Sequence, residues 1–271
     1  MRGVLLETVS WTSAQSLMAE DLVVVVPVGA ATKEHGPHLP LGTDFFVAEA
    51  LRRELAQRVR VICLPVVNYG YYPAFVDWPG SVSVGPETFA HYVGDIVRSL
   101  ARQGWRRFLV LNTGVSTTGP LDHMCRELAS ELGVRVAMTR ELGAAIWAHL
   151  REEQAGTHAG ESETSLMLAV RPDLVDMALA PCEVMTKPAP FETGRSRPPL
   201  ATLYGPMVPG PHGPPDMITA SGIHGDATLA TPEKGRALLA AMVDDLVEVV
   251  EELARVPLPA DTPPSAGDGP T

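Results

Sequence analysis

The chain has 271 residues, of which 45% are hydrophobic and 20% are charged, a balance that predicts one large globular domain with a sizeable core. Its formal net charge of −11 argues against nucleic acid or an anionic membrane as a partner, because phosphate binding needs a positive surface. No stretch reaches the roughly 18 consecutive apolar residues that a membrane span needs. The N-terminus is a poor signal peptide because Glu7 interrupts its short apolar run, so we expect a cytoplasmic protein.

Runs rich in Val, Ile and Leu predict buried strands, and they cover residues 22–28, 59–67, 107–112 and 134–139. Helical patterns alternate with these runs, and they cover residues 45–58, 86–104 and 121–133. This alternation predicts a mainly parallel central sheet with helices on both faces, the three-layer α/β/α sandwich class. In such a sheet, functional sites gather at the carboxyl ends of the strands.

The last third of the chain holds two segments without a strand or helix pattern. Residues 186–216 are dense in Pro and Gly, which predicts an extended loop that is either a lid, an assembly arm or a surface excursion without a role. Residues 256–271 are predicted to be a disordered tail. We therefore expect a single domain over residues 1–255.

The loop after the first predicted strand, residues 27–44, concentrates side chains that bind metals. It contains Glu34, His35, His38 and Asp44, and their imidazole and carboxylate groups suit Zn²⁺ or Mn²⁺. A cation held there would lower the pKa of a bound water. The alternative interpretation is that the two histidines only hydrogen-bond the turn.

A second group of ionisable side chains lies at the start of an apolar helical run, residues 157–170. It consists of His158, Glu161 and Glu163. On a helix, His158 and Glu161 are three residues apart and share a face, whereas Glu163 points elsewhere. Acidic residues in the first turn are also expected from the helix dipole alone.

Five motifs, spread in order over most of residues 22–250, resemble the creatininase (creatinine amidohydrolase) family. They read "PVG…EHGPHLPLGTD", "WPGSVSVGPET", "SLARQGWRRFLVLN", "HAGESETS" and "GIHGDATLATPEKG". The resemblance implies a three-layer α/β sandwich, in agreement with the predicted elements. It also implies a metal-dependent hydrolase of cyclic or linear amide C–N bonds, with two divalent ions, Zn²⁺ or Mn²⁺, often assembled as a hexamer.

The first motif departs from the family pattern, Glu-x-His-Gly-Pro-His followed by an Asp. His35, His38 and Asp44 match this pattern, but Lys33 stands at the position of the glutamate. Glu34 is adjacent to His35, and a local bulge would bring its carboxylate into the role of the missing one. The resemblance thus implies that this loop keeps part of the family's ligand set.

The later motifs also match the family pattern at some positions and differ from it at others. The family's Asn-Gly-His-Gly-Gly-Asn motif, whose His is a metal ligand, corresponds to residues 112–120, where Gly114 takes the place of that His. His158 and Glu163 match the HAG motif. The resemblance therefore implies one divalent ion in place of the family's pair.

The resulting site assignment covers ligands, proton transfer and substrate contacts. The expected metal ligands are His35, Asp44 and Glu163, with His38, His158 and His224 as possible additional ligands. A free carboxylate, Glu34 or Glu161, is expected to move the proton to the leaving nitrogen. The expected substrate-pocket residues are Tyr72, Asp77, Trp78, Ser116 and Thr117.

Lys33 is a further catalytic candidate, with several interpretations. Its ammonium would pair with Asp44 or Glu163 and supply the positive charge of a lost cation. It would otherwise bind an anionic substrate directly or, if desolvated, act as a nucleophile. The remaining interpretation is that Lys33 points to solvent.

Two functions follow from these residues. The first is a metal-dependent hydrolase of a small amide, lactam or related C–N bond other than creatinine, working with one Zn²⁺ or Mn²⁺ ion. The second, favoured by Lys33 and Gly114, is a metal-free family member that acts as a ligand-binding or scaffold subunit or as a non-hydrolytic biosynthetic enzyme. In both cases the expected partners are a small molecule and further copies of the chain, a hexamer by resemblance.

Overall fold

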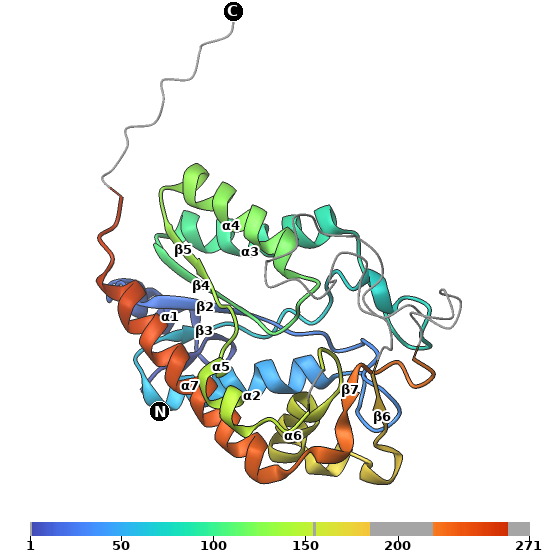
Figure 1. The fold of residues 1–271 in the computed structure, drawn as a ribbon. Helices are drawn as coiled ribbons and strands as arrows, with labels where there is room; N and C mark the ends of the chain where they lie inside the picture. Colours follow the sequence, from blue (N-terminus) through green and yellow to red (C-terminus); the bar gives the residue numbers. More distant parts are fainter. Residues whose placement is uncertain (1, 154–155, 185–218, 260–271) are drawn as a thin grey trace, which may run out of the picture.

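The computed structural model describes residues 2–153, 156–184 and 219–259, and in it a five-stranded parallel sheet lies between two layers of helices (Figure 1). The sheet has the strand order β1-β3-β2-β4-β5. Its strands are β1 (Val4–Leu5), β2 (Val23–Val28), β3 (Ile62–Cys63), β4 (Arg107–Asn112) and β5 (Arg135–Met138). All four pairings are parallel, which confirms the predicted α/β/α class.

The helices follow the strands in the order expected of βαβ units. They are α1 (Trp11–Met18), α2 (Thr43–Arg58), α3 (Pro86–Gln103), α4 (Thr118–Leu132), α5 (Ala144–Leu150), α6 (Glu161–Val170) and α7 (Pro232–Arg255). A small antiparallel pair, β6 (Cys182–Glu183) and β7 (Gly225–Asp226), lies near α6 (Figure 1). No helix in the described ranges is long and apolar enough to cross a bilayer.

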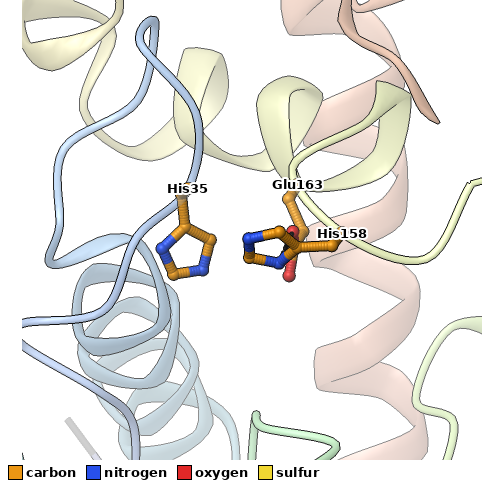
Figure 2. A group of neighbouring side chains, drawn as sticks. All are labelled: His35, His158 and Glu163. Atoms are coloured by element: carbon orange, nitrogen blue, oxygen red, sulfur yellow. Dashed lines mark ion pairs between the residues drawn. The ribbon is translucent and has the colours of Figure 1, made fainter. Parts of the chain in front are cut away.

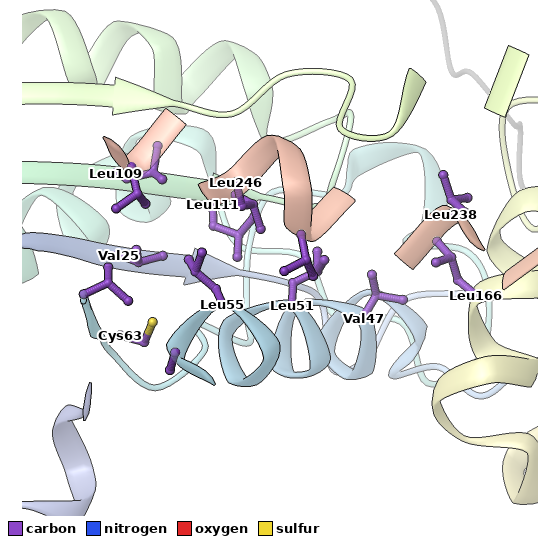
Figure 3. Close-up of a cluster of buried hydrophobic side chains, with 14 of the residues drawn as sticks. Val25, Val47, Leu51, Leu55, Cys63, Leu109, Leu111, Leu166, Leu238 and Leu246 are labelled. Carbon is purple, nitrogen blue, oxygen red and sulfur yellow. The ribbon is translucent and has the colours of Figure 1, made fainter. Parts of the chain in front are cut away.

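The central strand β2 is apolar along its whole length because both faces of the sheet are covered. Val25 packs with α2 and α7 through Leu51 and Leu246 (Figure 3). Val24 points to the opposite face, where it joins Phe89 of α3 in a second buried cluster. A strand buried on both faces shows a continuous apolar run without alternation, which is why the sequence predicts it well.

One sequence prediction needs correction in extent, one strand was missed, and two predicted segments fall wholly or mostly outside the described residues. The strand expected over 59–67 is only Ile62–Cys63, and Pro65, which has no N–H to donate, comes two residues after its end. The edge strand β1 was not predicted, because two residues are too few to form a pattern. The predicted loop at 186–216 and residues 260–271 of the predicted tail lie outside the described residues.

The carboxyl ends of β2, β4 and β5 meet at one edge of the sheet. The backbone there is joined across strands, since Thr113 donates to the Val28 carbonyl at 3.2 Å and Thr139 donates to the Val110 carbonyl at 3.0 Å. The β2–α2 loop, residues 29–42, therefore lies beside the loops that follow β4 and β5. This edge is where a site is expected in an open parallel sheet.

Gly235 marks the closest approach of α7 to α6, and this contact gives a test of the fold. A Cβ at Gly235 would lie 1.8 Å from the carbonyl oxygen of Ser165, a backbone atom that cannot move aside. Gly235→Ala should lower the free energy of unfolding in urea by at least about 1–3 kcal/mol. The matched control is Gly119→Ala in α4, where a Cβ meets nothing within 4 Å, so stability should stay unchanged or rise by up to about 1 kcal/mol. Equal stability of the two variants would contradict the close crossing.

Candidate functional site

Two imidazoles and a carboxylate converge at the carboxyl edge of the sheet. His35 comes from the β2–α2 loop, His158 from the segment before α6 and Glu163 from the first turn of α6 (Figure 2). One potential ligand atom of each residue lies within 4.8 Å of those of the other two. The two imidazole ring centroids are 4.9 Å apart, and both rings are buried. This group is called the His–Glu cluster below.

The β2–α2 loop is folded tightly enough to bring His35 back over the sheet. Gly36 has a left-handed backbone (φ +76°), a conformation that side chains other than glycine's rarely adopt, and its N–H donates to the Glu34 carboxylate. Lys33 donates its N–H to the Leu41 carbonyl at 3.0 Å and so closes the loop on itself. The loop geometry is therefore set by local hydrogen bonds and does not need a bound ion.

The hydrogen bonds of His35 determine which ring nitrogen is free. Its Nδ1 lies 2.9 Å from the carbonyl oxygen of Lys33, which can only accept, so Nδ1 carries a proton. In the neutral ring, Nε2 then holds a lone pair, and it faces Asp44 Oδ1 at 3.2 Å. Two acceptors in that position need a proton or a cation between them. Ligand atoms about 2.0–2.1 Å from one tetrahedral ion are themselves about 3.3 Å apart, so the spacing suits a shared metal.

His158 repeats this arrangement on the other side of the His–Glu cluster. Its Nε2 lies 3.0 Å from Glu34 Oε2, which leaves Nδ1 facing Glu163 Oε2 at 3.8 Å. Burial lowers the pKa of His158, against the opposing effect of the hydrogen bond to Glu34, so the ring is neutral near pH 7. Burial raises the pKa of Glu34, but the hydrogen bond from His158 and other interactions outweigh it and hold that pKa low. The lone pairs and carboxylate oxygens thus face one another, which fits a divalent cation.

Lys33 and Asp44 form a buried ion pair next to the His–Glu cluster. Lys33 Nζ is 2.7 Å from Asp44 Oδ2, and the two side chains are only 7% and 3% exposed. Burial disfavours the ammonium, but Asp44 and Glu163 more than offset this, so the pKa of Lys33 lies above its usual value. Burial likewise raises the pKa of Asp44, and Lys33 and His35 overcome it and hold that pKa well below its usual range.

This ion pair decides between the interpretations of Lys33. The expectation that Lys33 points to solvent is wrong, because its side chain packs beside the rings of Phe75 and Tyr72. A nucleophilic role needs the neutral amine, which the raised pKa disfavours. The pairing with Asp44 is the interpretation that agrees with the structure.

The structure places Glu161 away from the His–Glu cluster. The expectation that His158 and Glu161 share a helical face is wrong, because α6 begins at Glu161 and His158 precedes the helix. The Glu161 carboxylate pairs with Lys234 and accepts the backbone N–H groups of residues 152–153 at 2.9 and 2.8 Å. Of the two acidic residues in the first turn of α6, Glu163 is the one that approaches His158, with Oε2 at 3.8 Å from Nδ1.

The two remaining candidate histidines have protein partners of their own. His38 Nε2 lies 2.8 Å from Thr164 Oγ1, and burial together with the nearby His35 lowers the pKa of His38 to about 4. His224 Nδ1 lies 2.9 Å from Thr157 Oγ1. The backbone of His224 also pairs with that of His158, so His224 supports the segment that carries His158.

A cavity of about 370 Å³ opens next to the His–Glu cluster, and Asp44, Gly114 and Glu163 line it. Glu163 is 26% exposed and thus faces both the buried cluster and the cavity. Residues that directly follow β4 and β5, among them Thr113 and Thr139, form its other polar wall. The sequence does carry a signal for these residues, because they are polar and come straight after a strand.

The five expected pocket residues do not line this cavity. Tyr72 is buried beside Lys33, whereas Asp77 is exposed and Trp78 is half-buried. Ser116 is half-buried, and the Thr117 hydroxyl donates inward to the loop that follows β4. Of the five, Tyr72 therefore comes nearest to the charged groups of the site.

Sequence comparison relates the chain to known hydrolases. The profile of the creatininase family, described as creatinine amidohydrolase, matches residues 7–250. The chain is 32% identical over 251 residues to the mycofactocin precursor peptide peptidase of Mycobacterium tuberculosis, covering 89% of each. It is 27% identical over 277 residues to the creatinine amidohydrolase of Pseudomonas putida, covering 93% of this chain and 97% of that protein.

Solved structures give the same result. Two creatininases, one described as a manganese form and one a variant described as Zn-Zn type, match with TM-scores of 0.73 and 0.74. Each is 25% identical, and each match covers 94% of this chain and 100% of the solved one. The parallel α/β sandwich with histidines and carboxylates at its carboxyl edge defines an enzyme of the creatininase fold. The chain belongs to the creatininase family, as the sequence resemblance predicted.

Protonation of His38 should destabilise the folded protein as the pH falls, because burial lowers the pKa of His38. Because the pKa of His38 is about 4 in the folded protein and about 6.5 unfolded, the unfolded chain binds the proton first as the pH falls. The contribution of His38 to stability is thus complete above pH 6.5 and is lost toward pH 4. His38→Gln should reduce the loss of unfolding free energy between pH 7 and pH 5 by about 1–2 kcal/mol, measured in urea. The exposed His123, changed to Gln, is the control, and an equal effect of both changes would contradict this origin.

Proposed function

We propose that the protein hydrolyses an amide-type C–N bond with one divalent ion, Zn²⁺ or Mn²⁺, held by His35, His158 and Glu163. The observation that carries the proposal is the convergence of their potential ligand atoms within 4.8 Å. Asp44, expected from the sequence as a ligand, has Oδ1 at 3.2 Å from His35 Nε2 and is the candidate fourth ligand. The solved creatininases described with manganese and zinc support the choice of ion.

The chain's own groups have separable tasks in this reaction. A bound divalent ion supplies Lewis acidity and lowers the pKa of water. Glu163 also lines the cavity, so the carboxylate oxygen that does not face His158 can take a proton from water and pass it to the leaving nitrogen. Glu34 fixes the tautomer of His158 through the 3.0 Å hydrogen bond and so keeps Nδ1 directed at Glu163.

Two features of the site support one ion over the pair that the family resemblance implies. Lys33 Nζ lies 2.7 Å from Asp44 Oδ2, whereas His35 faces the other carboxylate oxygen, Oδ1. Gly114 lines the cavity at the position of the family's histidine ligand and offers no side chain. A second cation beside Asp44 would therefore meet a like charge and lack a ligand.

The substrate follows from the relatives only as a class. Among these relatives, one is named for creatinine, a small molecule, and another for a precursor peptide. Since Lys33 and Gly114 depart from the family motif, we propose a small-molecule or peptide amide other than creatinine. The single domain over residues 1–255 and the hexamer implied by resemblance stay predictions, for which the family match over residues 7–250 gives support.

One observation favours a second candidate, a metal-free member that binds a ligand or performs non-hydrolytic chemistry. The Lys33 ammonium already neutralises Asp44, the residue nearest to His35 Nε2. In that case His35 would carry the proton that two facing acceptors need. Metal content separates the two candidates.

Elemental analysis of the purified chain tests the proposed metal centre. We expect about one Zn or Mn per chain, lost on chelation together with hydrolysis of small amides and regained on adding either ion. Glu163→Gln should lower metal affinity by tenfold or more, because the amide is a weaker ligand than the carboxylate. Asp77→Asn, on an exposed residue, is the matched control and should keep full occupancy. A chain that stays metal-free after incubation with both ions would establish the second candidate instead.

Unfolding in urea with chelator present tests the Lys33–Asp44 pair. Lys33→Met leaves Asp44 buried without its cation, so we expect a loss of about 3–5 kcal/mol. The double variant Lys33→Met/Asp44→Asn removes both charges and should recover most of that loss. If the single and double variants lose the same stability, the ion pair is not what Lys33 contributes.

A further inference from the structure

Glu153 is a buried acidic residue that belongs neither to the His–Glu cluster nor to the lining of the cavity beside it. Its carboxylate oxygen Oε2 accepts the backbone N–H of Asp226 at 3.0 Å and that of Glu161 at 3.2 Å. Asp226 ends β7 and Glu161 begins α6, so the two donors come from segments that are far apart in the sequence. A single oxygen atom therefore joins β7 to the start of α6.

The backbone closes around this oxygen because glycines stand where side chains would collide with it. A Cβ at Gly160 would lie 2.6 Å from Oε2, one at Gly225 would lie 2.8 Å from it, and one at Gly156 would lie closer still. Glycine permits such a close approach because it has no Cβ. The three glycines, on two separate segments, thus leave the space that the Glu153 carboxylate fills.

His158 lies between these contacts and projects from the loop before α6 (Figure 2). Its backbone N–H donates to the His224 carbonyl at 3.2 Å, and its carbonyl accepts the His224 N–H at 2.9 Å. The loop at 156–160 and the residues that follow His224, 225–226, both pack on the Glu153 carboxylate. Glu153 therefore fixes both segments of the backbone pair that carries the His158 ring.

Glu161 holds the backbone of Glu153 in return. Its fully buried carboxylate accepts the N–H groups of Glu152 and Glu153 at 2.9 and 2.8 Å and pairs with the ammonium of Lys234. Burial raises the pKa of the Glu153 carboxyl group, and the nearby Glu161 carboxylate adds to this. A protonated carboxyl group still has an oxygen that accepts hydrogen bonds, so what the segment needs from Glu153 is the acceptor atom.

We propose that Glu153 is a positioning residue of the metal centre, whose Oε2 holds the loop before α6 so that His158 Nδ1 faces Glu163. The proposal rests on the proposed metal-dependent function and adds to it a residue that touches neither ion nor substrate. The 3.0 Å hydrogen bond from His158 Nε2 to Glu34 sets the ring orientation only while the backbone of His158 stays in place. Groups that orient a metal ligand in this way typically change metal affinity by tenfold or more.

Two variants of Glu153 separate positioning from stability. Glu153→Gln keeps an acceptor oxygen for the two N–H groups and should keep most of the affinity for Zn²⁺. Glu153→Ala removes that oxygen and should bind Zn²⁺ at least tenfold more weakly, measured by competition with a chelator. The control for lost stability is Val97→Ala, which shortens a fully buried side chain of α3 on the opposite face of the sheet and should keep the original affinity. Equal affinities of Glu153→Ala and the control, or equal weakening by Gln and Ala, would overturn the proposal.

NMR spectra of the chelated chain test the same residue without a metal. Labelling histidine with ¹⁵N shows which ring nitrogen carries the proton, and the hydrogen bond to Glu34 predicts a proton on His158 Nε2 alone. Glu153→Ala should move this signal toward the average of the two tautomers, whereas Glu153→Gln and Val97→Ala should leave it in place. The His158 signal is the one that His158→Gln removes.

The two measurements distinguish failure of this proposal from failure of the metal centre. An unchanged His158 tautomer in Glu153→Ala would overturn the positioning role, whatever the metal content of the chain. A chain that binds no Zn²⁺ but shows the expected change of tautomer would refute only the metal centre, and Glu153 would stand as the residue that positions His158.

Discussion

The buried carboxylate of Asp44 is the group on which the arrangement of the site depends. Asp44 lies in the first turn of α2, where the helix dipole favours negative charge, and its two oxygens face His35 and Lys33. The start of α2 is pressed against the end of β2, since a Cβ at Gly29 would lie 2.4 Å from the Asp44 carbonyl oxygen. The loop between Gly29 and Asp44 must therefore turn back on itself, and this turn is what brings Lys33 and His35 beside the carboxylate.

A second set of buried carboxylates fixes the other half of the site. Glu153 accepts the N–H groups of Asp226 and Glu161 at 3.0 and 3.2 Å, and burial raises its pKa. Gly160 packs so closely that a Cβ there would lie 2.6 Å from the Glu153 carboxylate. These contacts hold the segment on which His158 lies from the side opposite the His–Glu cluster. Protein contacts thus hold both imidazoles in place, which is the preorganisation that the proposed metal site would require.

The sequence predicts the elements and the loops of the site and the pairing of Lys33 with Asp44, but not all of the side-chain contacts. The strands Val23–Val28 and Arg107–Asn112 were predictable because a strand buried on both faces is a continuous apolar run. The choice between Glu161 and Glu163 was not, because it depends on the residue at which α6 begins, and spacing leaves that uncertain by more than one residue.

Charge balance connects Lys33 with the number of ions that the site can hold. The carboxylates that face the buried region are Glu34, Asp44 and Glu163, and the ammonium of Lys33 balances one of them. One divalent ion would balance the other two with both imidazoles neutral. Low-dielectric surroundings favour such neutrality, because an uncompensated buried charge is strongly destabilising.

The same charge balance connects the residue at position 33 with the total charge of the buried site. The glutamate that the family motif has at the position of Lys33 would add a fourth carboxylate, and four carboxylates need two divalent ions for balance. Lysine at this position changes the local charge by two units, which is the charge of one ion. Without an ion, the remaining negative charge would need protons, and burial disfavours one on His158 because it lowers the pKa of that imidazole. With Lys33 in place, the single ion of the proposed function would leave the buried region neutral.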